Sequence, residues 1–319
     1  MNRSGPCCRQ PTKVPVLSEC SSRQRESRVN TMKIAYLGTG KMGLPMARHL
    51  AHAGHDVIAF DVAPAQAAAA RQAGLSVAAS LAEAVGTADA IFSSMPNDAA
   101  FAAVSAEVAV AARAGAIYVD TSTISPAASA AAAPLLAARN IAYLRVTVSG
   151  NNHMAEAAKL TAMVSGPAAT YAQIRPLLEA FGPTQFYLGE SEQARLMKLV
   201  VNLLIAQTAG MLAEALTLGR KGGLDWKAMW QVISSSAVAS PIVMAKSVQL
   251  AEHDYAPTFT VDQMLKDVGL ILDAGAELRV PLGLTALLGQ MLQGSAAQGY
   301  AGEDYAAVIK SAGQAAGMA

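Results

Sequence analysis

The sequence predicts an α/β protein in which a doubly wound sheet domain is followed by an all-α domain, with a long interdomain helix joining the two. Two observations support this prediction. From Lys33 to Leu188, short apolar runs alternate with helix-like segments. After Leu188 no strand pattern returns, and a helix without proline is expected from Ser191 to Arg220. A chain of 319 residues is long enough for two domains, because compact units usually contain roughly 100 to 200 residues.

The elements of the sheet domain begin with a strand at Ile34–Leu37. A glycine-rich turn leads into a helix from Pro45, because proline suits a first helical position, and Gly54 stands where such a helix ends. The next strand is Val57–Phe60. Five further apolar runs predict a sheet of about seven strands: Ala90–Ser93, Ile117–Val119, Ile141–Val146, Ala162–Val164 and Phe186–Leu188.

The second domain is expected to contain only helices. Four segments after the long helix have helical character and are separated by glycine or proline: 225–235, 261–278, 282–293 and 303–318. We therefore predict a sheet domain at 32–190 and a helical domain at 191–319, the latter including the interdomain helix 191–220.

Residues 1–31 differ from the remainder in composition. They are rich in Arg, Ser and Cys, lack a sustained apolar period, and we expect them to be disordered. Two explanations remain: an organelle presequence, or an upstream start codon with Met32 as the native first residue, which we favour. No apolar core of a secretory signal is found in this segment.

Composition limits the function classes. The net charge is +1 and charged residues make up 15%, so the sequence lacks the excess of positive charge expected of a nucleic-acid-binding protein. All three cysteines fall within the first 20 residues, so the rest offers no disulfide framework, cysteine nucleophile or cysteine metal cluster. The apolar stretch Leu199–Leu218 contains Asn202, Gln207 and Glu214, which favours a buried helix over a membrane span. We expect a cytoplasmic protein with a small-molecule substrate and no metal.

A dinucleotide-binding fingerprint follows the first strand. The sequence Gly38-Thr39-Gly40-Lys41-Met42-Gly43 lies between a strand and a helix, as a Rossmann-type site requires. Gly38 would permit the tight turn, Gly40 would let the backbone approach a pyrophosphate, and Gly43 would allow close packing of helix on strand. A glycine turn without a ligand is the alternative.

Asp61 follows the second strand and points to NAD as the cofactor. Its carboxylate can accept hydrogen bonds from ribose hydroxyls, whereas a 2′-phosphate would meet a like charge, and the next basic residue is Arg71. The alternative, that Asp61 caps the helix beginning near Pro64, is compatible with this role.

Two further strand ends should border the same crevice, because ligands of doubly wound sheets lie at the carboxyl ends of the strands. They are Ser94–Asn97 and Asp120–Thr123. Met95 and Pro96 are expected to wall the cofactor, and the Thr123 hydroxyl to face the reacting end. Ordinary loop or capping chemistry is an equally simple explanation for both segments.

Lys198 and Asn202 stand out on the long helix. They lie four residues apart, and so on one face, within an otherwise apolar stretch. Desolvation should lower the pKa of the Lys198 amine toward the range useful for acid/base catalysis, and a bound nicotinamide should lower it further. Taken alone, the pair is better explained by a lysine that extends to solvent from a domain boundary.

Together these motifs resemble the β-hydroxyacid dehydrogenase family, which includes 3-hydroxyisobutyrate dehydrogenases and tartronate semialdehyde and glyoxylate reductases. The resemblance covers about residues 32–319 and rests on five segments: Leu37–Ala47, Asp120–Thr123, Val148–Gly150, Lys198–Asn202 and Lys266-Asp267. It implies hydride transfer between NAD and a small β-hydroxy acid or its semialdehyde, in a homodimer or homotetramer.

The resemblance also assigns roles to matching residues. Lys198 corresponds to the catalytic lysine and Asn202 to the substrate-orienting asparagine, while Ser149 and Gly150 lie where the family holds the substrate carboxylate. Lys266 would reach the nicotinamide and substrate, unless it is a solvated helix lysine. The residue types of these positions suit orientation and proton transfer.

One segment departs from the family pattern. Where the family usually has Asp-Ala-Pro-Val-Ser-Gly-Gly, this chain reads Arg145-Val-Thr-Val-Ser-Gly-Asn151. Asn151 allows fewer backbone conformations than the glycine that the family usually has here. It also adds a side-chain amide beside the expected position of the substrate carboxylate. Another carbonyl or imine substrate, or a non-catalytic dinucleotide-binding regulator, therefore remains as an alternative.

Overall fold

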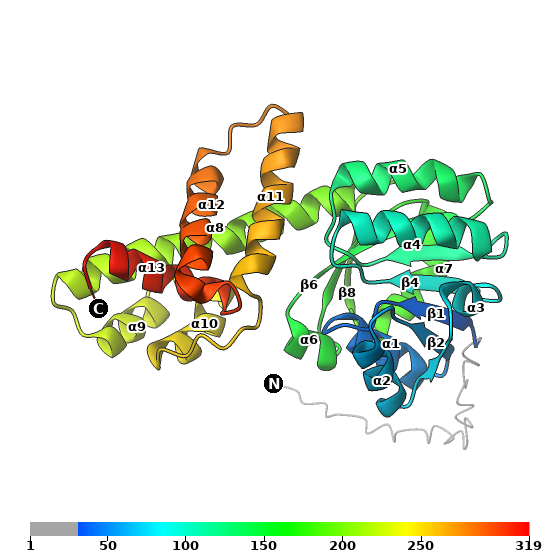
Figure 1. Ribbon diagram of the computed structural model, residues 1–319, viewed down its shortest axis with the longest axis horizontal. Helices are drawn as coiled ribbons and strands as arrows, with labels where there is room; N and C mark the ends of the chain where they lie inside the picture. The colour runs from blue at the N-terminus through cyan, green and yellow to red at the C-terminus, as the bar shows by residue number, and fades with distance from the viewer. Residues whose placement is uncertain (1–30, 319) are drawn as a thin grey trace, which may run out of the picture. The chain divides into compact units, whose positions relative to one another are not determined.

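The structure is a computed structural model that describes residues 31–318. Residues from Thr31 onward form one compact unit, in which a sheet with covering helices is followed by helices alone (Figure 1). The predicted disordered extension lies outside the described residues except for Thr31, and the exact domain boundaries remain a prediction. The predicted fold class is confirmed.

The sheet has eight strands in the order β3-β2-β1-β4-β5-β6-β7-β8. Strands β1 to β6 are parallel, as the alternation of strands and helices predicts, but β7 runs antiparallel to β6, and β8 is parallel to β7. The expected count of about seven missed β3, because two residues leave no periodic signal. The strand bounds are β1 Lys33–Leu37, β2 Asp56–Phe60, β3 Ser76–Val77, β4 Ala90–Ser93, β5 Ile117–Asp120, β6 Ala142–Ser149, β7 Thr161–Ser165 and β8 Thr184–Tyr187.

Helices cover both faces of this sheet. Alternating strand residues place Ile34 and Tyr36 in a core with α1 and α7, and Ala35 and Leu37 in a second core with α3, α4 and α5. Such two-sided burial explains why the parallel strands read as continuous apolar runs. The helices are α1 Gly43–His52, α2 Pro64–Gln72, α3 Leu81–Val85, α4 Asp98–Ala111, α5 Pro126–Ala137, α6 Asn152–Glu156 and α7 Ala168–Glu179.

The second part of the unit is helical, as predicted, and has its own apolar core. Sequence analysis missed α10, although Ser240 caps it and Pro241 occupies its first turn, and the predicted helix 303–318 is a 3₁₀ turn followed by α13. The elements are α8 Gln193–Lys221, α9 Trp226–Ser235, α10 Pro241–Ala251, α11 Val261–Glu277, α12 Gly283–Ser295, a π-helical turn Ala296–Tyr300, a 3₁₀ turn Tyr305–Ala307 and α13 Val308–Ala315.

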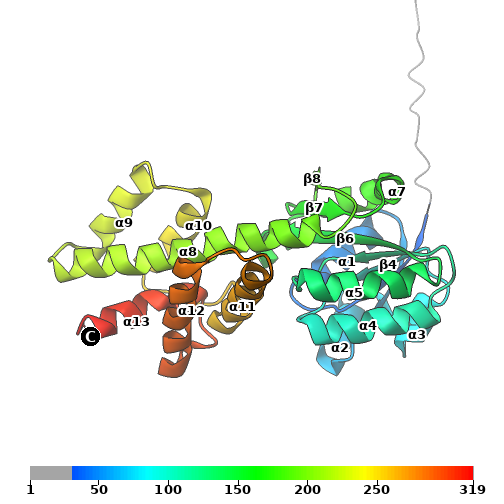
Figure 2. The same cartoon turned by 90° about the horizontal axis from the view of Figure 1, so that it is seen from above.

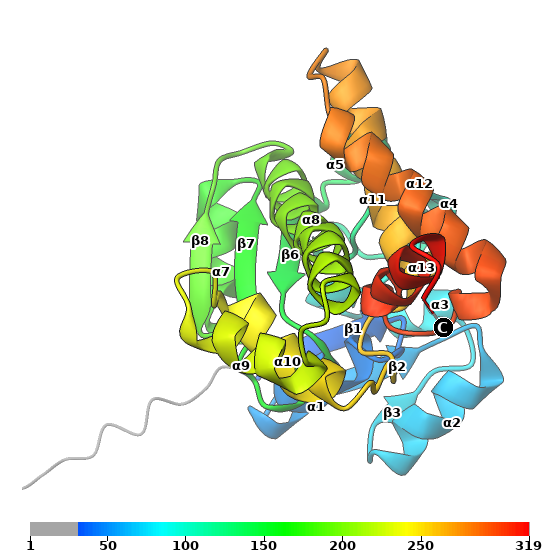
Figure 3. The same ribbon diagram turned by 90° about the vertical axis from the view of Figure 1, so that its left-hand side faces the viewer.

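The first turn of α8 is fixed to strands β6 and β7 (Figure 3). The Thr147 hydroxyl donates to the Ala194 carbonyl at 2.9 Å, and the Ser165 hydroxyl donates to the Ser191 carbonyl at 2.6 Å. Arg145 forms a 2.5 Å ion pair with Glu192 just before the helix. Arg145, which departs from the family pattern, is therefore paired with Glu192 at the start of α8.

Candidate active site

The glycine turn has the geometry that its residue spacing predicts. Gly38 has φ +85°, and a Cβ there would lie 2.5 Å from the Ser94 carbonyl oxygen. A Cβ on Gly43 would overlap the Gly38 carbonyl oxygen, so the helix can approach the strand only with glycine. Around Gly40 there is nothing within 4 Å of the Cβ position, so the backbone is accessible there to another molecule.

The amino terminus of α1, with its backbone N–H groups, lies beside this turn and has no side-chain cap. Met42 is its N-cap residue and makes no capping hydrogen bond, and the first turn holds no acidic side chain. Lys41 is exposed just before it. An anion such as a pyrophosphate would satisfy these N–H groups and the positive end of the helix dipole. These observations fit a dinucleotide.

Asp61 joins the glycine turn to the end of β2. Its carboxylate accepts from the Thr39 backbone N–H at 2.7 Å and, with the other oxygen, from the Ala63 N–H at 2.9 Å. The N-cap position of α2 is Ala63, so Asp61 is not the side-chain cap of that helix. A carboxylate has about four acceptor sites, which leaves capacity for ribose hydroxyls.

The ends of β4 and β5 are tied together on the other side of the turn. The Met95 N–H donates to the Ser122 hydroxyl at 2.7 Å, and the hydroxyls of Ser94 and Thr121 are 2.5 Å apart. The Met95 methyl group lies 2.8 Å from the Cβ position of Gly38, against the turn, whereas Pro96 is exposed. Met95 therefore packs against the glycine turn, whose backbone is accessible at Gly40.

A fully buried arginine anchors α8 to the end of β5, and sequence analysis did not single it out. Arg195 donates to Asp120 at 2.5 Å, to the Ser122 carbonyl at 2.6 Å, to the Tyr143 hydroxyl at 3.0 Å and to the Ser129 hydroxyl at 3.3 Å. Both charged side chains have no exposed surface. This network fixes the helix one turn before Lys198.

Lys198 and Asn202 lie on the face of α8 that turns toward α11. Lys198 is partly buried, and its amine makes no hydrogen bond or ion pair with residues 31–318. Desolvation lowers the Lys198 pKa to about 8, with Asp267 opposing the shift and Lys266 adding to it. The predicted direction of the pKa shift is confirmed. The amine can therefore gain or lose a proton near neutral pH.

Two residues of α11 complete this cluster. The Asn202 amide donates to Asp267 at 2.6 Å, and Asp267 is 1% exposed. The Lys266 amine donates to the Thr123 carbonyl at 2.8 Å and lies 2.7 Å from the second Asp267 oxygen, within ion-pair range but outside hydrogen-bond angles. Lys266 thus joins α11 to the loop after β5. Asp267 was quoted in the motif, but its contact with Asn202 was not foreseen.

The predicted substrate loop follows β6. Gly150 has φ +135°, and a Cβ there would lie 2.7 Å from the Leu160 side chain. The Asn151 side-chain oxygen accepts from the Met154 N–H at 3.0 Å and so caps α6, which gives this residue a structural task beside its predicted one. The Ser149 hydroxyl makes no hydrogen bond within residues 31–318. It remains available to a ligand.

Two histidines lie at α6, the helix that follows the substrate loop. His49 Nε2 lies 3.0 Å from the Ala155 carbonyl and so links α1 to α6. His153 is exposed and lines a cavity of about 530 Å³ together with α10 and the segment after it. Neither contacts Lys198 by any bond in the described chain.

These features can support one type of chemistry. The dinucleotide-compatible turn and Met95 lie at the same sheet edge as Thr123, whose backbone carbonyl accepts a hydrogen bond from Lys266 of α11. Lys198 and Asn202 are held against α11 at this point by the Asn202–Asp267 bond. An amine whose pKa is lowered by desolvation to about 8 suits proton transfer coupled to the transfer of a hydride.

Comparison with known proteins identifies relatives of both parts of the chain. Residues 33–189 match the family described as the NAD binding domain of 6-phosphogluconate dehydrogenase, and residues 193–312 match that described as NAD-binding of NADP-dependent 3-hydroxyisobutyrate dehydrogenase. The chain is 36% identical to 2-(hydroxymethyl)glutarate dehydrogenase of Eubacterium barkeri, covering 88% of this chain and 94% of the relative.

Two further similarities extend over nearly the whole length. L-threonate dehydrogenase of Cupriavidus necator is 31% identical, with 87% of this chain and 95% of the relative covered. The structure of 3-hydroxyisobutyrate dehydrogenase of Mycobacterium tuberculosis with L-serine superposes with a TM-score of 0.80 at 30% identity, covering 88% of this chain and 98% of that one.

Proposed function

The chain belongs to the β-hydroxyacid dehydrogenase family, whose members are NAD(P)-dependent enzymes acting on CH–OH groups, and on this premise we propose its specific reaction. We propose reversible hydride transfer between NAD and a small β-hydroxy acid or its semialdehyde, with Lys198 as general acid/base. The observation that carries the proposal is a partly buried amine with a pKa of about 8, held beside Asn202 and Asp267.

In the oxidative direction, the neutral Lys198 amine takes the proton of the substrate hydroxyl and becomes an ammonium group. Asn202 orients the hydroxyl, while Ser149, Gly150 and Asn151 hold the carboxylate, and Thr123 faces the reacting carbon. Bound NAD would supply the hydride acceptor. In the reductive direction the Lys198 ammonium returns the proton to the carbonyl oxygen. The protein contributes orientation and a matched pKa.

The residues that would hold the cofactor form three groups. The turn Gly38, Thr39, Gly40, Lys41, Met42 and Gly43 would bind the pyrophosphate. Asp61 would accept from the ribose and disfavour a 2′-phosphate by charge repulsion, which supports NAD over NADP. Met95, Pro96, Thr123 and Lys266 would border the nicotinamide.

A panel of substrates and cofactors tests this proposal. Initial rates would be measured with NAD and NADP on 3-hydroxyisobutyrate, L-threonate and 2-(hydroxymethyl)glutarate, together with the reverse reactions of small semialdehydes. We expect turnover of at least one β-hydroxy acid, with kcat/KM at least tenfold higher for NAD. Faster turnover with NADP would overturn the cofactor preference while leaving the reaction class in place.

A second candidate follows from the altered loop at Asn151. A changed carboxylate site would favour a different substrate, either another carbonyl compound or a cyclic imine. Adding imines to the same panel separates this candidate from the first. A non-catalytic regulator would bind NADH with micromolar affinity and turn over no member of the panel.

We also propose a homodimer or homotetramer in the cytoplasm. The exposed apolar residues of α8 support self-association. Fractionation of the cells of origin would check the location.

A further inference from the structure

The substrate loop, Ser149 to Asn151, is joined at each end to a regular element. Ser149 is the last residue of β6 and pairs with Thr161 of β7, whereas Asn151 is the N-cap residue of α6. A Cβ on Gly150 would lie 3.2 Å from the Met154 Cβ, so the middle of the loop lies directly against α6. The position of the loop therefore depends on β6 at one end and on α6 at the other.

Helix α6 is too short to hold its own position. It has five residues, Asn152–Glu156, and isolated helices shorter than about 12 residues are marginal in water. The Asn151 side chain caps its first turn, and Ala155 is fully buried in the core that α6 shares with α1. Contacts with the rest of the sheet domain must therefore determine where α6 lies.

His49 of α1 supplies a polar contact at the end of α6. Its Nε2 lies 3.0 Å from the Ala155 carbonyl oxygen and 3.1 Å from the Glu156 carbonyl oxygen. Because carbonyl oxygens only accept hydrogen bonds, Nε2 carries the hydrogen and is the donor in both contacts. The last carbonyls of a helix have no partner within that helix, and a histidine side chain is one of the groups that can bind them.

Helix α1 connects this contact with the expected dinucleotide site. It lies beside α6 (Figure 1), and Met46 and Leu50 are buried in its face toward the sheet. Its first residue, Gly43, belongs to the glycine turn, and His49 lies about 9 Å farther along the helix axis. One buried helix therefore contacts the dinucleotide turn at one end and the helix of the substrate loop near the other.

We propose that His49 is a positioning residue for the substrate loop. It fixes α6 against α1 and so sets where Ser149 and Gly150 meet the carboxylate of the substrate. This inference rests on the proposed function, because that function assigns the carboxylate to this loop. His49 acts through α6 and needs no contact of its own with substrate or cofactor.

Loss of the His49 contact should affect substrate binding more than cofactor binding or chemistry. The substrate would lose a correctly placed loop, whereas the dinucleotide turn lies at the opposite end of α1 and Lys198 lies on α8, which Arg195 anchors separately. We therefore expect a higher KM for the β-hydroxy acid, with little change in kcat or in the KM for NAD. A residue needed only for stability would not separate these constants.

Two variants of His49 test this expectation. His49→Leu removes both donated hydrogen bonds, so the KM for the β-hydroxy acid should rise about fivefold to tenfold, with kcat and the KM for NAD within about twofold of wild type. His49→Gln should restore most of the wild-type KM, because the glutamine amide nitrogen can donate from nearly the same place as Nε2. Steady-state rates with substrate and NAD varied in turn give the three constants.

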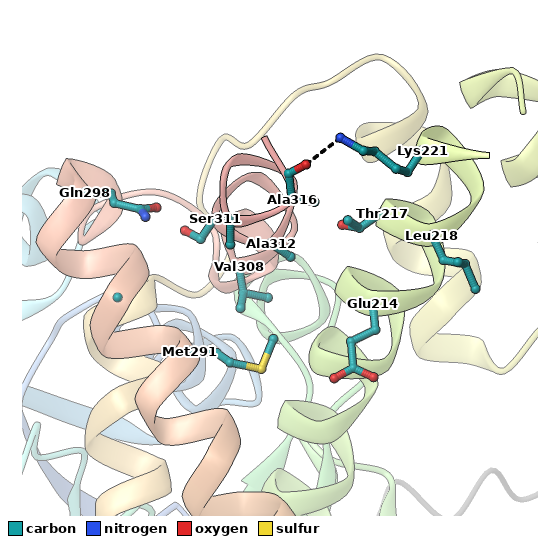
Figure 4. Close-up of a pocket in the computed structure, with 12 residues that line it drawn as sticks. Glu214, Thr217, Leu218, Lys221, Met291, Gln298, Val308, Ser311, Ala312 and Ala316 are labelled. Carbon is teal, nitrogen blue, oxygen red and sulfur yellow. Dashed lines mark hydrogen bonds between the residues drawn. The ribbon is translucent and has the colours of Figure 1, made fainter. Parts of the chain in front are cut away.

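Lys221→Met is the matched control. The Lys221 amine donates to the Ala316 carbonyl at 2.7 Å, and so ties the ends of α8 and α13 by the same kind of bond, in the wall of a cavity (Figure 4). Figure 2 shows α13 beside the end of α8 that is remote from the sheet. This variant should change none of the three kinetic constants.

Hydrogen–deuterium exchange tests the same inference without a substrate. The backbone amides of Ala157 and Lys159 donate to carbonyls of α6, so their exchange reports on how firmly this helix is held. Peptides from residues 149–160 should exchange at least about threefold faster in His49→Leu, and at the wild-type rate in His49→Gln and Lys221→Met. Peptides from β4 and β5 should exchange alike in all four proteins.

Three results would overturn the proposal. They are unchanged exchange of residues 149–160 in His49→Leu, an equal rise of the KM values for substrate and for NAD, and a KM in His49→Gln as high as that in His49→Leu. Failure of the proposed function gives a different result, because the wild-type protein would then turn over no β-hydroxy acid. The exchange measurement would still decide whether His49 holds α6 and the substrate loop in place.

Discussion

Two polar clusters lie on the same helix, three residues apart, and differ in how completely their groups are paired. Arg195 has four hydrogen bonds and no exposed surface, in a network with Asp120 and Tyr143. Lys198 has a partly buried amine and no bond within the described chain. In the Arg195 cluster, the protein itself supplies the hydrogen-bond partners. The Lys198 amine can still form hydrogen bonds, which a substrate could provide. We therefore predict that the Arg195 cluster supports stability and the Lys198 cluster supports turnover.

The largest effect is expected from Lys198→Met. Loss of the general acid/base should lower kcat by about 10² to 10⁴-fold, while NADH binding, measured by fluorescence titration, changes little. The variant should also be more stable at pH 7. Desolvation lowers the Lys198 pKa to about 8, so the folded state disfavours the ammonium form.

The sign of that stability effect depends on pH. The unfolded chain binds more protons than the folded chain between about pH 8 and the ordinary lysine pKa of 10.5, so wild-type stability rises with pH across this window. Below it, Lys198→Met should raise the free energy of unfolding by about 3 kcal/mol. Near-normal turnover of this variant would contradict the assignment of Lys198.

Arg195→Met should break the Arg195 cluster. Removing one partner leaves the Asp120 carboxylate buried and unpaired, which should lower the free energy of unfolding by about 3 to 5 kcal/mol in urea denaturation. Arg175→Met serves as the control, because the Arg175–Glu179 pair is 63% and 52% exposed and should contribute less than about 1 kcal/mol. Equal losses of unfolding free energy in Arg195→Met and Arg175→Met would contradict the stabilising role proposed for the Arg195 cluster.

Asp267→Asn tests the role of the Lys198 cluster through the pH dependence of kcat/KM. In the wild-type protein, kcat/KM for oxidation should rise with pH and level off above about 8, because the neutral Lys198 amine is the base. Asp267 raises the Lys198 pKa, so its neutralisation should move this rise to lower pH. We also expect about a tenfold fall in kcat, since Asn202 loses a charged acceptor.

A fall in activity with an unmoved pH profile would show that Asp267 only holds Asn202 in place. Asp273→Asn, elsewhere on the same helix α11, provides a matched control that should shift neither quantity.

Lys266→Met is expected to have the smallest effect of the four. It removes the hydrogen bond from α11 to the Thr123 carbonyl, and the KM for NAD should rise about threefold to tenfold. The effect on kcat should be smaller, because Lys198 and Asn202 remain in place. A loss of kcat as large as that of Lys198→Met would instead give Lys266 a share in the chemistry.

Local patterns predicted the parts of the site that depend on neighbouring residues. The strand–turn–helix context identified the turn at Gly38 and Gly43, and the four-residue spacing placed Lys198 and Asn202 on one face. The contact between Arg195 and Asp120 was missed because it joins residues 75 positions apart, and nothing in either neighbourhood specifies the other. The same reason hides the Asn202–Asp267 bond.

The errors in the fold have comparable causes. The antiparallel direction of β7 depends on how the chain returns after α6, which a run of apolar residues does not encode. Helix α10 was overlooked although Ser240 and Pro241 mark its start, so that signal was present and unused. The apolar length of α8 was recognised, but only the packing separates its buried side from its exposed one.

Helix α8 is attached at two separate points. It runs without interruption from the Arg195 anchor, past Lys198, to Asn202, where α11 is attached through Asp267. Movement of α11 away from Thr123 would break one Lys266 hydrogen bond and leave both attachments of α8 intact. The attachment of α8 to the sheet through Arg195 therefore does not depend on the contact between Lys266 and the Thr123 carbonyl.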